Sequence, residues 1–193
     1  MKKSFSITVN NNHTYKAAQY IKECGGNAFD MGIALQLIAC VTEPLLTGIG
    51  GSGIAMCKRE NEEDARFIDF FSTMPSVPLN DMNRPKEVEI DFGESKQTFF
   101  IDGGSIATPT LIAGLRYIHK NFASLPWNIL VEGAINVSSN QIPLRTSLKK
   151  ILSILNPIVS YNQELFEIFY DDKSNMHSVF SYASTDDYIE IQR

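Results

Sequence analysis

Residues 28–41 constrain the fold of this chain more than any other segment, because they are apolar around nearly the whole helical circumference. Phe29, Ile33 and Leu37 have helical spacing, and apolar residues between them extend the apolar surface to the other faces. A helix that is apolar all round is buried, so we expect other elements to pack around this one. Asp30 falls in its first turn, where the helix dipole favours a negative charge.

The segments flanking this helix carry strong turn signals. Residues 14–24 have the apolar spacing of a helix and stop at Gly25-Gly26, since glycine can adopt the left-handed conformation that ends helices. After the apolar helix, a glycine-dense loop over residues 48–53 leads into two predicted strands. These strands, 54–57 and 66–71, are joined by a charged turn, which predicts a hairpin.

The rest of the chain mixes short strands with helices. A proline-punctuated loop over residues 75–87 is followed by segments of period two, which predict strands, and of helical period. The 193 residues thus predict an α/β or α+β domain, or one domain plus a fragment of a second. The expected elements are strands at 88–92 and 98–101, helices at 110–121, 127–139, 144–155 and 164–170, and a weak strand at 179–182 within a polar end.

Composition argues against several classes of protein. With 17 Lys and Arg against 22 Asp and Glu, the net charge of −5 argues against nucleic acid or acidic lipid as a partner. No apolar run approaches the ~20 residues of a membrane span. The basic start is followed by polar residues, so we expect no signal peptide and a cytoplasmic location. Cys24, Cys40 and Cys57 fit neither a disulfide framework nor a zinc site, and Cys40 is expected to be buried.

The glycine-dense loop is the first candidate site. Gly48, Gly50, Gly51 and Gly53 match the G-x-G-x-x-G pattern of dinucleotide-binding loops. Such a site needs a strand before the loop and a helix after it, whereas here a helix precedes and a strand follows. The loop also lacks the lysine of a P-loop. We therefore interpret these glycines as a structural connection and predict no cofactor.

The other polar clusters predict no metal site. His13, His119 and His177 lie at no metal-ligand spacing and are expected to be solvated on the surface. The acidic pairs Asp171-Asp172 and Asp186-Asp187 lack the glycine and glutamate of a calcium loop. The residues by themselves therefore indicate a domain of mixed helix and strand with no complete catalytic constellation.

Several short segments nevertheless resemble, together and in order, the gamma-glutamyltranspeptidase family. Residues 25–30 resemble its G-G-N-A-x-D signature, and residues 41–53 resemble its V-x-E-P segment followed by S-G-I-G-G-G-G. Order and spacing agree over about residues 14–143 and fade from residue 144. We therefore assign residues 1–143 to the N-terminal region of a family-like large subunit and residues 144–193 to a helical and polar tail. Further matching segments are Arg66 to Phe70, Thr108 to Leu115, Leu125 to Trp127 and Glu132 to Ile135.

The resemblance implies an α+β fold: part of the four-layer αββα sandwich of N-terminal nucleophile hydrolases. Precursors in this family cleave themselves into a large and a small subunit. The new N-terminal threonine of the small subunit attacks the gamma-glutamyl carbonyl with its own amine as base. Glutathione is the typical substrate, and the acyl group passes to water or to an amino acid.

Two departures from the family pattern bear on activity. No histidine here follows the Thr-Thr or Thr-Ser pair that begins the small subunit, so we expect the nucleophile on a second chain and this chain alone to be inactive. The family arginine in D-F-R-E holds the α-carboxylate of the glutamyl group. Here the segment is Asp69-Phe70-Phe71-Ser72, so Phe71 stands at the arginine position and no substrate-binding residue is assigned. Arg66 lies too far along the strand to replace it.

Two hypotheses follow. The first is a truncated or split family member, whose partner chain supplies the threonine and whose assembled form hydrolyses or transfers a gamma-glutamyl or another acyl group. The second is a non-catalytic remnant or an interaction subunit, which would also fit the missing arginine and nucleophile. Under the first, uncovered strand edges and an apolar sheet face predict either a partner chain or self-association.

Overall fold

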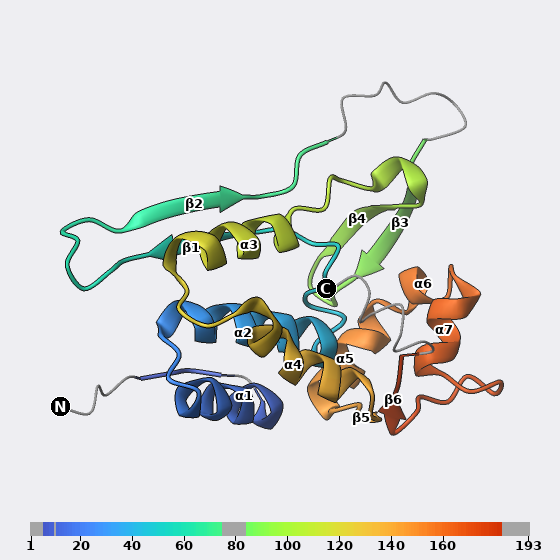
Figure 1. The fold of residues 1–193 in the computed structure, drawn as a ribbon. Helices are drawn as coiled ribbons and strands as arrows, with labels where there is room; N and C mark the ends of the chain where they lie inside the picture. Colours follow the sequence, from blue (N-terminus) through green and yellow to red (C-terminus); the bar gives the residue numbers. More distant parts are fainter. Residues whose placement is uncertain (1–5, 10, 75–83, 183–193) are drawn as a thin grey trace. The chain divides into compact units, whose positions relative to one another are not determined.

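A computed structural model describes residues 6–9, 11–74 and 84–182 of the chain. Helices alternate with antiparallel strand pairs in an α+β fold (Figure 1). The described residues form two compact units, one within residues 1–72 and 109–140 and the other within residues 73–108 and 141–182. The first unit contains four helices and one strand pair: α1 (Asn12–Glu23), α2 (Ala28–Thr42), β1 (Gly53–Cys57), β2 (Arg66–Phe70), α3 (Leu111–Phe122) and α4 (Trp127–Ser138). The second unit contains β3 (Lys86–Asp91), β4 (Lys96–Ile101), the short 3-10 helix η2 (Gly103–Ser105), β5 (Ile142–Pro143), α5 (Thr146–Ile154), α6 (Asn156–Val159), α7 (Gln163–Phe169) and β6 (Val179–Phe180).

The first two helices are where the sequence predicts them, and asparagines cap both. Helix α1 begins at Asn12, before the expected residue 14, because the side chain of Asn11 caps it by accepting from the Thr14 amide at 3.0 Å. At α2, the Asn27 side chain accepts from the amide of Asp30 at 3.0 Å, and the Asp30 carboxylate accepts from the Asn27 amide at 2.7 Å. This reciprocal capping box fixes where α2 starts.

The Asp30 carboxylate also joins α2 to the α3–α4 connection. It is fully buried and accepts hydrogen bonds from the Ser124 amide, from the Ser124 hydroxyl at 2.6 Å and from the Leu125 amide at 3.0 Å. The Asn27 amide group donates to the Phe122 carbonyl at 2.9 Å. A buried charge is tolerated only when it is well hydrogen-bonded, so this junction fixes how α2 meets α3 and α4.

Helix α2 packs against α1, α3 and α4, as its apolar composition predicts (Figure 1). Leu37 and Ile38 are fully buried there, together with Ile21 of α1 and Leu130 of α4. The prediction that α2 is buried on every side is wrong for this chain. One face of α2 is left open: Gly32 is exposed, and Leu35, Gln36 and Ala39 are only half-buried.

The predicted hairpin is present, and the strands expected at residues 88–92 and 98–101 pair to form a second one. Strand β1 pairs with β2, with Gly53 opposite Phe70 and Cys57 opposite Arg66. Strand β3 pairs with β4 through a turn in which Gly93 has φ +90°, the left-handed region that favours glycine. Strand β3 starts at Lys86, within the segment expected to be loop, while residues 75–83 of that loop lie outside the described residues.

The second unit departs from prediction at its helix ends. Helix α5 stops at Ile154, and Pro157 opens the short helix α6 instead of ending the helical region, since proline is tolerated in a first turn. Buried side chains there include Leu148, Leu152 and Phe169. No helix among the described residues is long and apolar enough to cross a membrane.

Replacing Asp30 by alanine should destabilise the chain by about 3 kcal/mol, because the amides of Asn27, Ser124 and Leu125 would lose a buried acceptor. Chemical denaturation monitored by circular dichroism measures this change. Asp172→Ala is the matched control: Asp172 is exposed, so its removal should change stability by less than about 0.5 kcal/mol. Equal midpoints for the two variants would show that the junction is unimportant.

Candidate functional site

The glycine-dense loop is held by one hydrogen bond just before it and another within it. Gln36 of α2 donates to the Thr47 hydroxyl at 2.9 Å just before the loop, and the Gly51 amide donates to the Gly48 carbonyl at 2.9 Å within it. A Cβ on Gly51 would lie 3.0 Å from the Gly48 carbonyl oxygen, whereas a Cβ on Gly48 or Gly50 would meet nothing within 4 Å. The turn at Gly51 therefore restricts side-chain size, while the glycines at 48 and 50 leave open space.

This loop caps the N-terminus of α3. The Gly51 carbonyl accepts from the amides of Thr110 at 3.1 Å and Leu111 at 3.0 Å. The Thr110 side chain makes no capping hydrogen bond, because its hydroxyl donates to the Phe70 carbonyl at the end of β2. The glycine loop, the end of β2 and the start of α3 thus form one corner, which we call the strand-end corner.

The Phe70 ring fills this corner between two glycines. A Cβ on Gly53, the cross-strand partner of Phe70, would lie 2.9 Å from the ring, and a Cβ on Gly114 of α3 would overlap the ring atoms. Any larger residue at either position would push the ring away. The two glycines therefore allow β2 to end close against α3, which places residue 71 at the edge of the corner.

Phe71 lies one residue beyond β2. Its ring is 66% exposed, and its backbone amide donates to the Asp69 carboxylate at 2.9 Å. The sequence predicts that this position carries no charge where the resembled family has an arginine. The Asp69 carboxylate matches the first residue of the D-F-R-E pattern, so the local difference from that pattern is the missing cation at residue 71.

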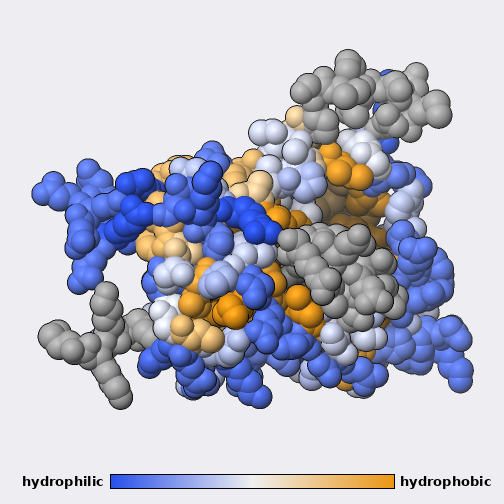
Figure 2. Space-filling view, in the orientation of Figure 1, coloured by the Kyte–Doolittle hydropathy of each residue, from blue (hydrophilic) through white to orange (hydrophobic). Residues whose placement is uncertain are grey.

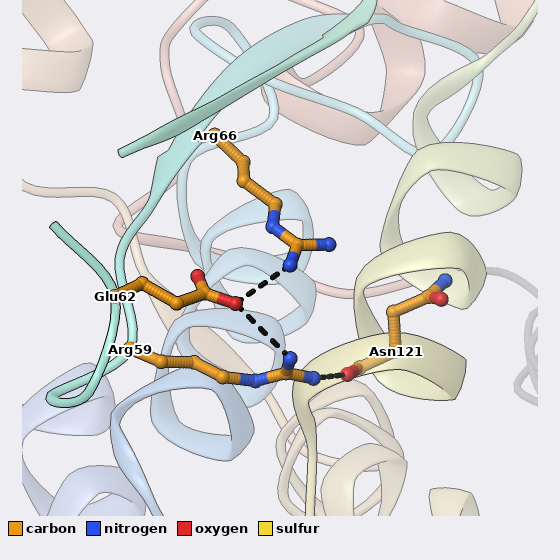
Figure 3. A network of polar contacts seen from close by, with 4 residues as sticks. All are labelled: Arg59, Glu62, Arg66 and Asn121. Carbon is orange, nitrogen blue, oxygen red and sulfur yellow. Dashed lines mark hydrogen bonds and ion pairs between the residues drawn. The ribbon is translucent and has the colours of Figure 1, made fainter. Parts of the chain in front are cut away.

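Arg66 is engaged at the opposite end of β2, in the network of Figure 3. Its guanidinium lies 2.6 Å from the Glu62 carboxylate, which Arg59 also approaches at 3.3 Å. Arg59 donates in addition to the Asn121 carbonyl of α3. Partial desolvation raises the pKa of Glu62, but the charges and hydrogen bonds of Arg66 and Arg59 outweigh it and hold that pKa below its usual value. Arg66 thus serves the hairpin turn and is not at the strand-end corner.

An apolar cavity of about 280 Å³ adjoins the corner. It lies between α2, β1 and α3, and its lining includes Gln36, Ser52, Cys57 and Phe70. Burial raises the pKa of the Cys57 thiol, which keeps it protonated and unreactive at neutral pH. The cavity can accept an apolar group, whereas it offers no charged side chain to a ligand.

The structure bears on the nucleotide and metal hypotheses. Helix α2 precedes the glycine loop and β1 follows it, so the order is the reverse of a dinucleotide-binding loop. Within the part of the chain that is described, no three His, Cys, Asp or Glu side chains are grouped to hold a metal ion. Asp171 instead builds a turn, accepting from the amides of Lys173 and Asn175 at 2.9 and 2.7 Å. Asp186 and Asp187 lie outside the described residues.

One prediction about the histidines is wrong. His119 is half-buried rather than solvated: a ring nitrogen lies 2.8 Å from the Leu125 carbonyl, and the ring packs edge-on against Trp127 at 5.4 Å. The sequence signal for the partial burial of His119 was the Leu-Pro-Trp segment at residues 125–127, because it places the Trp127 ring at the start of α4, soon after α3. Cys40 is buried, as predicted.

Comparison with known proteins places this geometry in context. The family model described as Gamma-glutamyltranspeptidase matches residues 15–190. The capsule biosynthesis protein CapD proenzyme of Bacillus anthracis is 28% identical over 162 residues, covering 84% of this chain and 26% of that protein. A glutathione hydrolase proenzyme of Arthroderma benhamiae is 29% identical over 139 residues, covering 66% of this chain and 22% of that protein. The chain thus spans about a quarter of the length of these relatives.

A solved structure has the same fold. The crystal structure of the Bacillus anthracis transpeptidase CapD superimposes with a TM-score of 0.78 at 23% sequence identity, over 99% of this chain and 59% of that chain. At this identity the likeness establishes the fold and says nothing of the reaction.

Gly114→Ala should destabilise the chain by about 2 kcal/mol, because the new methyl group would displace the Phe70 ring from the strand-end corner. Gly32→Ala is the control within a helix of the same unit: its Cβ would meet nothing within 4 Å, so the higher helix propensity of alanine should stabilise by up to about 1 kcal/mol. Thermal or urea unfolding of both variants measures the two effects. The packing argument is wrong if Gly114→Ala stabilises as much as Gly32→Ala.

Proposed function

Because this chain belongs to the gamma-glutamyltranspeptidase family, we propose that it is the first part of an acyl-transferring enzyme completed by a further polypeptide. The completed enzyme hydrolyses or transfers an acyl group related to gamma-glutamyl. In this proposal the chain supplies scaffold beside the reacting atoms, and the completing polypeptide supplies the nucleophile, an N-terminal threonine.

The uncovered apolar surface of the first unit is the observation that carries this proposal. Ile54, Met56 and Phe67 lie on the outward face of the β1–β2 hairpin and are 60%, 76% and 62% exposed. Helix α2, apolar all round, has the open face at Gly32, and Figure 2 shows hydrophobic surface in the region where Figure 1 places this helix. Apolar patches of this kind mark surfaces that a partner covers.

A second sheet would cover the hairpin and produce the layered αββα arrangement of N-terminal nucleophile hydrolases. Outward apolar residues alternate along β1 and β2 with residues packed on the helices, which is the pattern of a strand pair with a helical layer on one side and a sheet on the other. Several relatives are named proenzymes, which fits an enzyme whose working form is made of two polypeptides.

The acyl group that this enzyme accepts differs from gamma-glutamate in our proposal. Phe71 offers an exposed ring where the family arginine would pair with the α-carboxylate, so that carboxylate would find no cation at residue 71. An acyl group without the α-carboxylate needs no such partner. A non-catalytic interaction subunit is the second candidate, and the same Phe71 favours it, since the residue removes a substrate contact.

Phe71→Arg should raise the preference for gamma-glutamyl p-nitroanilide over 4-aminobutyryl p-nitroanilide, which lacks the α-carboxylate. A charge-assisted hydrogen bond stabilises by about 1.5–3 kcal/mol, so we expect at least a tenfold change in the ratio of kcat/KM in the assembled protein. Tyr117→Arg is the control, because Tyr117 is exposed on α3 outside both the strand-end corner and the outward hairpin face, so the ratio should stay unchanged.

Three results of these assays bear on the proposal. Turnover by residues 1–193 alone would contradict an external nucleophile. Turnover by the assembled protein with no response to Phe71→Arg would contradict the role of residue 71 only. An assembled protein that acts on no acyl donor would overturn the proposed reaction and favour the interaction subunit.

The chain by itself should self-associate, because the apolar residues on the outward face of the β1–β2 hairpin are exposed to solvent. Replacing Met56 and Phe67 by lysine should shift its mass in size-exclusion chromatography with light scattering towards that of a monomer. Tyr117→Lys is the control, since Tyr117 is 53% exposed on α3 away from this face. A chain that is already monomeric at high concentration would argue against an unpartnered face.

A further inference from the structure

An open hollow of about 500 Å³ lies in the second unit, lined wholly by residues between Ser153 and Met176. Its lining is rich in uncharged polar groups: the hydroxyls of Ser153, Ser160 and Ser174 and the side-chain amides of Asn156 and Gln163. The volume is within the range of about 300–1,000 Å³ that ligand pockets occupy. No residue of the strand-end corner contributes to it.

These polar groups keep hydrogen-bonding capacity for a ligand. The Ser160 hydroxyl donates to the side-chain oxygen Oδ1 of Asn156 at 3.2 Å, which leaves the side-chain nitrogen Nδ2 of Asn156 with no protein acceptor among the described residues. Gln163 donates to the Glu167 carboxylate at 2.7 Å, which leaves its own carbonyl oxygen available. The lining therefore offers both donors and acceptors in one hollow.

Apolar surface forms another part of the lining. The rings of Phe166 and Tyr170, one turn apart on α7, are stacked at 4.6 Å with an interplanar angle of 5°, and Met176 lies with them in the lining. Burial raises the pKa of the Tyr170 hydroxyl, so it stays neutral at physiological pH. The Asp171–Asn175 turn holds Ser174 at φ +61°, a conformation uncommon for serine, beside these rings.

The absence of charge in this lining restricts the ligand class. Among the described residues, no Lys or Arg lines the hollow, so it has no partner for a phosphate or a carboxylate, and the neighbouring Glu167 carboxylate is engaged by the Gln163 amide group. A ligand must instead combine several hydroxyl or amide groups with a flat apolar face. We propose that this hollow binds a neutral saccharide unit, with its hydroxyls on the serine and amide groups and its apolar ring face towards Phe166, the half-buried member of the stacked pair.

Titration of the isotope-labelled chain with maltose and with N,N′-diacetylchitobiose, followed by NMR, tests this assignment. We expect saturable chemical-shift changes confined to residues 153–176 for at least one of the two, with a Kd of about 1 mM. Asn156→Ala and Gln163→Ala should each weaken binding at least fivefold, a change of about 1 kcal/mol. Both positions lie at the surface of the hollow, and the spectrum itself reports whether each variant is folded.

Gln19→Ala is the matched control, because Gln19 is an exposed glutamine on α1 of the first unit. Its removal should leave saccharide binding unchanged. Absence of saturable shifts with both disaccharides, or shifts confined to other residues, would overturn the proposal. So would an equal response to glutamate, because a lining without charge should discriminate against an ionic ligand. None of these outcomes depends on the acyl-transfer proposal.

Discussion

The buried carboxylate of Asp30 is the interaction on which the first unit depends. Removing a charged group from water is costly, and here the cost is offset by donors from two parts of the chain, Asn27 before α2 and Ser124 with Leu125 in the α3–α4 connection. The backbone amides of these residues and the Ser124 hydroxyl donate to the carboxylate, which therefore joins the two segments. Gly26 belongs to the same junction, because a Cβ there would lie 2.9 Å from the Leu125 side chain.

The strand-end corner extends this frame to the candidate site. The Gly51 carbonyl caps α3, and the close approach of Gly53 and Gly114 to Phe70 holds the end of β2 against it. The corner depends on small residues and backbone groups and not on the side chain at position 71. This scaffold therefore tolerates a change of side chain at residue 71, and our proposal assigns the altered acyl preference to the exposed Phe71.

The open faces of α2 and of the β1–β2 hairpin have a common physical meaning. Both present apolar groups that the described residues leave exposed, and the chain spans about a quarter of the length of its curated relatives. Burial of that surface by a second polypeptide would supply a large part of the stability of an assembled protein. The hollow in the second unit is of a different kind, since its polar and uncharged lining suits a small ligand better than a protein layer.

The sequence by itself determined the element order and the family. Helical periodicity, glycine punctuation and strand alternation located α1 to α4 and both hairpins, because these signals act over a few residues. Ordered short motifs indicated the gamma-glutamyltranspeptidase family, which the match over residues 15–190 confirms. The departure from the family pattern at residue 71 was also visible in the sequence, since it needs only the identity of Phe71.

Only the tertiary structure decided which residues act together over long separations. Asp30 is joined to Ser124, the half-buried His119 packs against Trp127, and Phe70 lies between Gly53 and Gly114. It also decided that α2 keeps an open face, although its composition predicted complete burial. The physical reason is that burial and hydrogen-bond partners depend on which elements are present to pack, and local periodicity carries no information on a neighbour far away in the chain or on another polypeptide.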